Sequence, residues 1–237
     1  VCALRVQRAS PSAWIACSHG DLTAQKRGDS RISATWARQR RQLLSRWAGG
    51  LVSSPHQPAV CPVRLRCHQN ASYHHMADDE QLCQTVSRLL AEGKVVGWMQ
   101  GRMEFGPRAL GGRSIIANPS FPGIADKINR QIKFRERWRP FCPSILDTVA
   151  SEMIQTDHPA PYMTITFEVS ELWKKRVPEV VHEDGTARVQ IVDAETNPRY
   201  YRLLKEMERL NGNGVVLNTS MNRRGEPMAV SYTHLRA

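Results

Sequence analysis

The segment GRMEFGPRALGGRS, residues 101–114, constrains this chain more than any other stretch. It lies between two short apolar runs, residues 95–99 and 115–117, which predict buried strands on either side of it. Glycine lets a backbone approach a ligand closely, and arginine carries a planar set of donors that suits phosphate or carboxylate oxygens. Arg102, Arg108 and Arg113 stand here among small and apolar residues, which is unusual for a solvated loop. The segment therefore predicts an anion site, with a solvated surface loop as the alternative.

Composition places the chain among soluble globular proteins. It has 237 residues, of which 41% are hydrophobic and 23% charged, enough for one or two domains with a core. It contains no run of ~18 apolar residues, so we expect neither a transmembrane helix nor a membrane partner. The first residues lack the basic and then apolar layout of a secretory signal, so we expect a cytoplasmic location.

The net charge of +11 is concentrated in the first part of the chain. Residues 1–76 hold 11 Lys and Arg against 2 Asp and Glu, whereas residues 77–237 hold 22 against 20. We leave residues 1–75 unassigned and expect them to be a disordered basic arm or a sequence read in a wrong frame, with a folded module as the third possibility. Because the excess charge lies there, nucleic acid is an unlikely partner for the rest of the chain.

From residue 76 onward, regular patterns predict one α/β domain that ends at residue 228. Apolar residues with helical spacing predict helices over residues 79–92, 122–132 and 197–210, and residues 148–154 predict a turn or two of helix. Apolar runs or alternation predict strands over residues 94–99, 114–117, 141–146, 163–169, 188–192 and 215–217. Strands mixed with helices indicate a single domain with one twisted sheet, in which ligands bind in loops beyond the strand ends.

A second basic segment, KFRERWRP, covers residues 133–140. Lys133, Arg135, Arg137 and Arg139 occupy alternate positions, so in an extended segment they would share one face. Like charges on one face repel unless they meet anions, and the aromatic neighbours argue against full exposure. We expect ligand contacts from some of these residues, while a solvated basic edge strand is the alternative.

Two polar loops offer further candidates. His182, Glu183 and Asp184 could do acid–base or metal work, but a turn at residues 184–185 capped by a threonine accounts for about half of that loop. The predicted strand 215–217 delivers neutral donors and acceptors that suit a phosphate, a carbamoyl group or a ribose, although they also fit an ordinary strand-end turn: Asn218, Thr219, Ser220 and Asn222.

Four motifs, in order and spacing, resemble the C-terminal domain of O-carbamoyltransferases, the family of nodulation and antibiotic-tailoring carbamoyltransferases. They are GRMEFGPRALGGRSIIANP, KINRQIKFRERWRPFCPS, HEDGTARVQIV and VVLNTSMNRRGEP. The resemblance covers residues 77–228 and implies a YrdC-like fold, an α/β domain with a twisted open mixed sheet and flanking helices. It also implies that this domain takes carbamoyl phosphate and ATP, with Mg²⁺, and forms carbamoyl adenylate.

The resemblance further implies the residues that bind carbamoyl phosphate, with Asn218 and Asn222 nearby: Arg108, Lys133, Arg139, Arg188 and Ser220. Among these we expect catalytic roles for Arg108, Lys133 and Arg139. We expect contacts to carbamoyl phosphate or ATP from the remaining candidates: Arg102, Arg113, Arg135, His182, Arg188, Asn218, Ser220 and Asn222. We assign no metal ligands in this chain.

The sequence departs from the family pattern in three respects. Gly112 replaces the usual asparagine before the Arg-Ser pair, and Asn118 stands where an aspartate is common. The family's N-terminal transfer domain, with an actin-like ATPase fold and its own metal ion, is expected as a missing partner. Residues 229–237 do not continue the family pattern, so we expect a fragment. An RNA-binding YrdC-like module or an inactive fragment are the alternative functions.

Overall fold

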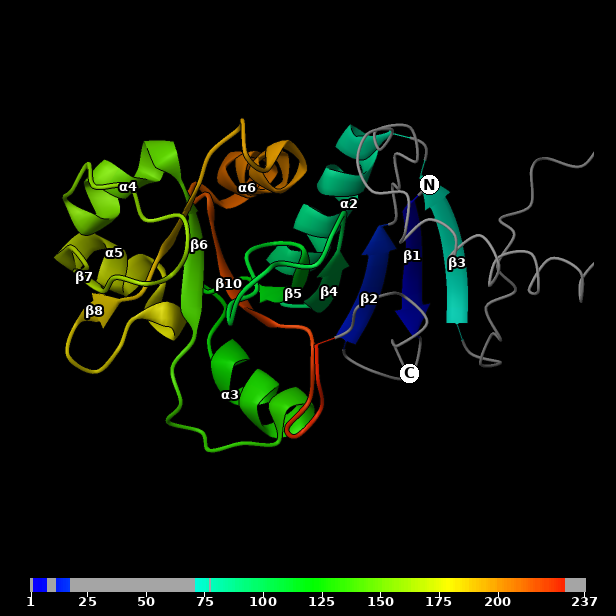
Figure 1. The fold of residues 1–237 in the computed structure, drawn as a ribbon, viewed down its shortest axis with the longest axis horizontal. Helices are drawn as coiled ribbons and strands as arrows, with labels where there is room; N and C mark the ends of the chain where they lie inside the picture. The colour runs from blue at the N-terminus through cyan, green and yellow to red at the C-terminus, as the bar shows by residue number, and fades with distance from the viewer. Residues whose placement is uncertain (1, 8–11, 18–70, 77, 229–237) are drawn as a thin grey trace, which may run out of the picture. The chain divides into compact units, whose positions relative to one another are not determined.

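The structure is a computed structural model that describes residues 2–7, 12–17, 71–76 and 78–228 (Figure 1). Its main sheet is mixed and open, with the strand order β3-β1-β2-β4-β5-β10-β6-β9. The central strands β4 (Val95–Met99), β5 (Arg113–Ala117), β10 (Val215–Ser220) and β6 (Cys142–Leu146) pair in this order, each antiparallel to its neighbour. Strand β9 (Gln190–Val192) then pairs in parallel with β6. This architecture confirms the predicted α/β class with an open mixed sheet.

Three further strands come from the basic N-terminal segment. Strands β1 (Cys2–Gln7), β2 (Ser12–Cys17) and β3 (Ala71–Met76) are joined in antiparallel pairs, and β2 pairs in parallel with β4. Most of the segment for which we expected disorder or a wrong reading frame, residues 8–11 and 18–70, lies outside the described residues. The domain boundaries at residues 75 and 228 stay predictions.

The helices follow from apolar periodicity and from capping residues. Helix α2 (Asp79–Ala91) begins at Asp78, whose side chain accepts a hydrogen bond from the Glu80 backbone N–H at 3.0 Å. Helix α6 (Pro198–Asn211) begins at Asn197 and ends at Gly212, which adopts a positive φ of 73°. The two helices pack against each other on one side of the sheet, and α3 (Ile124–Ile128) lies on the other side (Figure 1). No helix among the described residues is long and apolar enough to cross a membrane.

Two helical features differ from the sequence expectation. The predicted helix 122–132 consists of α3 and a π-helical turn, η1 (Asn129–Lys133), which ends at Phe134 with a positive φ of 49°. Helix α4 (Asp147–Ile154) forms where residues 148–154 predicted a turn or two of helix, whereas α5 (Glu171–Arg176) and the 3₁₀ turn η2 (Pro178–Val180) were not predicted. The last two are too short to show a helical period.

The predicted strand over residues 163–169 is wrong for most of its length. Only β7 (Phe167–Glu168) forms, and it pairs with β8 (Thr186–Ala187) in a separate two-stranded sheet. Met163 has a positive φ of 54°, which turns the chain away from an extended path. The alternation of apolar and polar residues was real, but Ile165 is exposed, so it did not mark a buried face.

Part of the core lies between the sheet and the α2–α6 pair. Trp98 of β4 and Tyr200 of α6 are fully buried, with ring centroids 6.3 Å apart. At one edge of this sheet, strand β4 ends, β5 begins, β10 ends and β6 begins: Met99 lies opposite Arg113, Ser220 opposite Ser114, and Asn218 opposite Cys142. This edge, which we call the loop edge, carries the loops with the candidate site residues.

Candidate functional site

Glu104 organises the arginine-rich loop from inside. Its Oε1 accepts hydrogen bonds from the backbone N–H groups of Leu110 at 2.7 Å, Gly112 at 2.6 Å and Arg113 at 3.3 Å. A Cβ atom at Gly112 would lie 3.0 Å from this oxygen, so a side chain there would press on the carboxylate. Gly112, which replaces the usual asparagine, therefore lets the backbone lie close to the Glu104 carboxylate. Glu104 was given no role from the sequence, because backbone partners leave no pattern in a sequence.

Arg113 lies under the same loop. Its side chain is only 4% exposed, and its guanidinium donates to the backbone carbonyls of Gln100 at 2.9 Å, Gly112 at 2.8 Å and Gly101 at 3.2 Å. Burial lowers the pKa of Arg113, and the nearby Glu104 carboxylate opposes that shift. We expected Arg113 to contact substrate, and the structure places its guanidinium among backbone carbonyls.

Three amide side chains, two of them buried, hold the other end of the loop. Asn218 donates to the carbonyl of Ala109 at 3.0 Å, and Gln190 donates to the carbonyl of Leu110 at 2.9 Å. Asn197 reaches the carbonyl of Leu110 at 3.4 Å. The backbone that flanks Arg108 is thus held through both its N–H groups and its carbonyls, while Arg108 itself is exposed at the tip of the loop.

Lys133 ends the π-helical turn and is only 5% exposed. Its ammonium donates to the carbonyl and the Oγ of Ser220 at 2.5 and 3.2 Å, and to the carbonyl and Oδ1 of Asn222 at 3.0 and 3.1 Å. All four acceptors are neutral. Burial, followed by repulsion from Arg135, lowers the pKa of Lys133 to about 7. A buried ammonium without a carboxylate among its described partners is expensive unless an anion joins it.

The other basic residues of this segment do not share one face with Lys133, so the extended arrangement we expected is wrong. The left-handed conformation of Phe134 turns the chain directly after Lys133. Arg135 then donates to Asn129 Oδ1 at 2.7 Å and lies 4.6 Å from the ring centroid of Phe141, where burial lowers its pKa. Arg137 pairs with Asp126, and Arg139 is exposed.

Arg188 joins the loop edge through a cysteine. Its Nε and Nη2 lie 3.3 and 3.0 Å from Sγ of Cys142, the residue opposite Asn218 in the sheet. Ser220 lies two positions after Asn218 in β10, so the two side chains point to the same face of the sheet. Their positions on the strand are roughly 7 Å apart. We name this group the Lys133 cluster, and it contains five of the expected site residues together with the cysteine: Lys133, Arg188, Asn218, Ser220, Asn222 and Cys142. Arg108 lies beside it, next to the Ala109 carbonyl that Asn218 binds.

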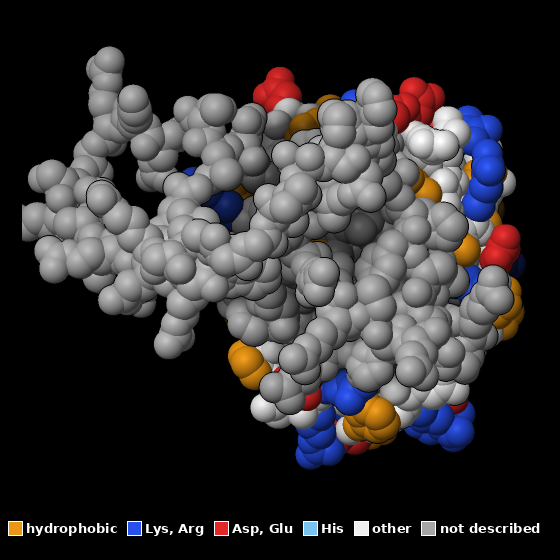
Figure 2. All heavy atoms as spheres, turned by 90° about the vertical axis from the view of Figure 1, so that its right-hand side faces the viewer, with side chains coloured by type: hydrophobic (Ala, Val, Ile, Leu, Met, Phe, Trp, Pro, Cys, Tyr) orange, Lys and Arg blue, Asp and Glu red, His pale blue; other side chains and the backbone are white. Residues whose placement is uncertain are grey.

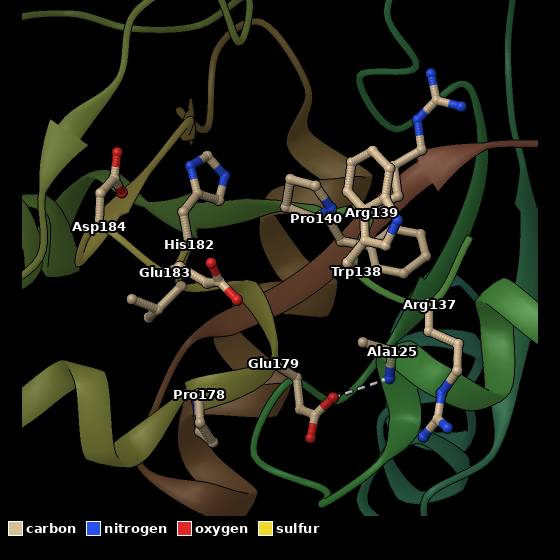
Figure 3. A pocket seen from close by; sticks show the side chains of 12 residues that line it. Ala125, Arg137, Trp138, Arg139, Pro140, Pro178, Glu179, His182, Glu183 and Asp184 are labelled. Carbon is tan, nitrogen blue, oxygen red and sulfur yellow. Dashed lines mark hydrogen bonds between the residues drawn. The ribbon is translucent and has the colours of Figure 1, made fainter. Parts of the chain in front are cut away.

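His182 and Arg139 border a separate hollow of about 620 Å³. Figure 3 shows His182 and Glu183 on one wall, and Trp138 and Arg139 on the other. His182 Nδ1 lies 3.2 Å from Thr186 Oγ1, whose hydroxyl donates to Asp184 at 2.6 Å. The local turn that we weighed as an alternative therefore forms, and it occupies Asp184. Among the described residues, no group of three or more His, Cys, Asp or Glu is arranged to hold a metal ion.

Several exposed basic side chains elsewhere on the described surface have acidic partners. Arg130 lies 3.3 Å from Asp126, and Arg209 lies 2.9 Å from Glu206. On the described part of the face in Figure 2, Lys and Arg side chains are interspersed with acidic and apolar ones. This surface contrasts with the Lys133 cluster, where cations gather without carboxylates among their described hydrogen-bond partners.

The open mixed sheet and the cations gathered at its loop edge define an α/β domain with a cation-rich site at the strand ends. The carbamoyltransferase C-terminus family matches residues 87–236, and this chain belongs to that family. The matched range runs past residue 228, where we had placed the end of the domain.

Relatives of known sequence agree. The chain is 45% identical over 170 residues to an uncharacterized protein of Synechocystis sp., covering 63% of this chain and 28% of that protein. It is 39% identical over 157 residues to nodulation protein NolO of Bradyrhizobium diazoefficiens, covering 65% of this chain and 29% of that protein. It is 41% identical over 140 residues to nodulation protein U of Sinorhizobium fredii, covering 59% and 25%. The chain thus spans less than a third of each of these relatives. Among solved structures, HypF of T. kodakarensis matches with a TM-score of 0.46 at 18% identity, over 68% of this chain and 19% of that one.

Proposed function

We propose that this chain is the carbamoyl-adenylate-forming part of an O-carbamoyltransferase, which binds carbamoyl phosphate and ATP at the loop edge. The observation that carries the proposal is the environment of Lys133. An ammonium buried against four neutral oxygens lacks the negative charge that would compensate its burial, and a phosphate group supplies that charge.

The neighbours of Lys133 suit such a ligand. Arg188 lies at the same edge with a thiol as its described side-chain partner, and Arg108 extends from a loop that Glu104 and Asn218 hold in place. Each charge-assisted hydrogen bond to a phosphate oxygen contributes roughly 1.5–3 kcal/mol. In this proposal Lys133, Arg188 and Ser220 bind carbamoyl phosphate, and Arg108 closes the site from above.

Carbamoyl adenylate formation needs two polyanions side by side. The overall reaction consumes one water and releases the phosphate of carbamoyl phosphate and the pyrophosphate of ATP. A carbamate oxygen becomes bonded to the α-phosphorus of the nucleotide. Fixed cations lower the repulsion between the substrates and stabilise charge that spreads in the transition state. Mg²⁺ would arrive with the nucleotide and neutralise its phosphates, held mainly by phosphate oxygens and water.

Transfer of the carbamoyl group to an acceptor hydroxyl belongs, in this proposal, to an N-terminal domain outside this chain. The relatives are more than three times as long as the matched region, which leaves room for such a domain. The acceptor substrate and the transfer-domain metal ion would then bind in that part. The same domain would take up the carbamoyl adenylate that forms at the loop edge.

The test is calorimetric titration of carbamoyl phosphate into the chain and into Lys133→Ala, followed by a pyrophosphate-release assay with ATP and Mg²⁺. Lys127→Ala is the matched control, because Lys127 lies on α3 in the same helical segment but outside the Lys133 cluster. We expect Lys133→Ala to abolish measurable binding and Lys127→Ala to bind normally. A folded Lys133→Ala protein that binds carbamoyl phosphate as tightly as the parent chain would refute the proposal. RNA binding that survives in the parent chain at high salt would favour the alternative function, that of an RNA-binding module.

A further inference from the structure

The Lys133 ammonium has no donor left for a ligand in this structure. An ammonium carries three N–H groups, and four oxygens of Ser220 and Asn222 lie within hydrogen-bond distance of Nζ. Lys133 is also only 5% exposed, so little of its surface is open to an approaching molecule. An anion can therefore bind the ammonium only if some of these oxygens leave it.

The two residues that supply the oxygens are held with different firmness. Ser220 is the last residue of β10 and pairs with β5 in the main sheet. Met221, the next residue, is buried, and its N–H donates to the Arg113 carbonyl at 3.0 Å. Asn222 lies beyond this anchor, outside the sheet, and is half-buried. Asn222 can therefore leave Lys133 without breaking the sheet, whereas Ser220 cannot.

Asn222 begins a short turn that bonds mostly to itself. We call this turn, residues 222–226, the strap. Asn222 Nδ2 donates to the carbonyl of Glu226 at 2.8 Å, and the Glu226 N–H donates to the carbonyl of Arg223 at 3.2 Å. Beyond Asn222 the strap is exposed. These internal bonds let the strap move as a unit.

The described hydrogen bonds that leave the strap go to Lys133 and Ser220. Asn222 accepts from Lys133 Nζ through its carbonyl at 3.0 Å and its Oδ1 at 3.1 Å. Its Oδ1 also accepts from Ser220 Oγ, and its N–H donates to the Ser220 carbonyl. Arg223 lies 5.9 Å from the ring centroid of the exposed Phe134, and the segment after β10 runs beside the helical segment that begins with α3 (Figure 1). The ammonium that an anion would bind is thus one of the two tethers of the strap.

We propose that the strap closes the anion site at Lys133, and that an anion opens it by replacing Asn222 as the partner of the ammonium. The oxygens of Asn222 supply acceptors without negative charge, whereas a phosphate supplies both, which favours the exchange. Ser220 stays in place and contacts the anion. The inference rests on the proposed function, in which Lys133 binds carbamoyl phosphate, and adds that binding is coupled to opening of the strap.

Calorimetric titration with carbamoyl phosphate tests whether Asn222 competes with the anion. Asn222→Ala removes one of the two contacts to Lys133 and the bond to Glu226. Because apparent affinity falls with the fraction of molecules whose site is open, we expect this variant to bind at least about threefold more tightly than the parent chain. Ser220→Ala is expected to bind more weakly. Arg224→Ala, an exposed change in the same strap, is the matched control and should bind like the parent.

The rival interpretation is the one that the sequence predicted, in which Asn222 contacts the ligand. Weaker or unchanged binding in Asn222→Ala, while Arg224→Ala binds normally, would overturn this inference and leave the proposed function intact. Absence of binding in the parent chain and in all variants would refute the proposed function and this inference with it.

Trypsin cleavage after Arg223 reports opening of the strap directly, because a protease cuts a segment that has opened locally. We expect carbamoyl phosphate to accelerate this cleavage in the parent chain. In Asn222→Ala the cleavage should be fast with or without the ligand. Cleavage after Arg209 on α6, read by mass spectrometry in the same digests, is the internal control. Slower cleavage after Arg223 in the presence of carbamoyl phosphate would show that the strap closes over the ligand, and would overturn the inference.

Discussion

Lys133 Nζ and Ser220 Oγ lie 3.2 Å apart although the two residues are 87 positions apart in the chain. The contact joins the end of the π-helical turn to the end of β10, so it ties the second and fourth sequence motifs into one site. Ser220 Oγ also donates to Asn222 Oδ1 at 2.6 Å, and both oxygens accept from the ammonium. The Lys133 ammonium is buried and its described partners are all neutral. The loss of its proton should therefore fall in a pH range that can be measured.

Lys133 should make the stability of the chain depend on pH. Its pKa is lowered from 10.5 to about 7 in the folded chain by burial, whereas the unfolded chain keeps the ordinary value. Between these values the unfolded chain binds more protons, so the free energy of unfolding should rise from pH 7 toward pH 10, by at most about 1.4 kcal/mol per pH unit. Urea denaturation at pH 7, 8 and 9 measures this slope.

The control for this prediction is Lys133→Met, which removes the titrating group. We expect the slope of stability against pH to become smaller in the variant, whatever its absolute stability. Identical slopes in the two proteins would show that Lys133 keeps its proton in the folded chain throughout this range.

Arg108→Ala should weaken carbamoyl phosphate binding far more than Arg223→Ala or Arg224→Ala. Arg108 lies on a loop whose neighbouring carbonyl is bound by the buried Asn218, so its position is fixed. Loss of its contact to an anion is expected to cost roughly 2–4 kcal/mol. Arg223 and Arg224 are exposed in a turn after β10, and each should contribute less than ~1 kcal/mol. Calorimetric titration of the three variants decides the question, and equal losses would indicate a diffuse basic surface.

Glu104→Ala should destabilise the domain. The substitution leaves the N–H groups of Leu110 and Gly112 without their acceptor, and we expect a loss of about 3 kcal/mol in the free energy of unfolding. Glu92→Ala, a change of an exposed carboxylate at the end of α2, should cost less than ~0.5 kcal/mol. Chemical denaturation of both variants checks the difference. A Glu104→Ala protein as stable as the parent would mean that water replaces the carboxylate.

Asn129→Ala should destabilise the second basic segment, residues 133–140. The fully buried Asn129 amide donates to the carbonyls of Arg137 and Arg139 at 3.2 and 3.0 Å and accepts from Arg135. We expect the variant to lose about 2–4 kcal/mol of stability. Gln131→Ala, an exposed change two residues later, is the control. Thermal or urea unfolding of the two proteins gives the comparison, and equal midpoints would contradict the bridging role.

Sequence patterns predicted the elements whose stabilising contacts are local. The apolar stripe of α6 and its two capping residues, Asn197 and Gly212, gave both ends of that helix to within one residue. The same reasoning failed for residues 133–139, because alternating charges were taken as a sign of extended backbone. There the path of the chain is set by Phe134 in a left-handed conformation and by the buried Asn129 amide, and neither leaves a periodic signal.

The candidate site was predicted in part for a similar reason. Several cationic, amide and hydroxyl side chains of the four motifs were identified from the sequence, and the structure brings Lys133, Ser220 and Asn222 into direct contact. Residues that act through backbone groups, such as Glu104 and Gln190, received no role. A carboxylate that accepts from N–H groups six and eight positions away looks the same in a sequence as one that faces solvent.

The bonds around Glu104 also determine how the arginine-rich loop fluctuates. A glycine-rich segment outside helices and strands would ordinarily exchange its amide hydrogens with solvent deuterium within seconds, because its N–H groups are open to water. Here the amides of Leu110, Gly111 and Gly112 are engaged by Glu104 and Ser114. Their exchange must wait for an opening that also frees Arg113 from three carbonyls. These three amides should therefore retain their protons as long as those of the flanking strands, which makes the loop a kinetically rigid part of the sheet.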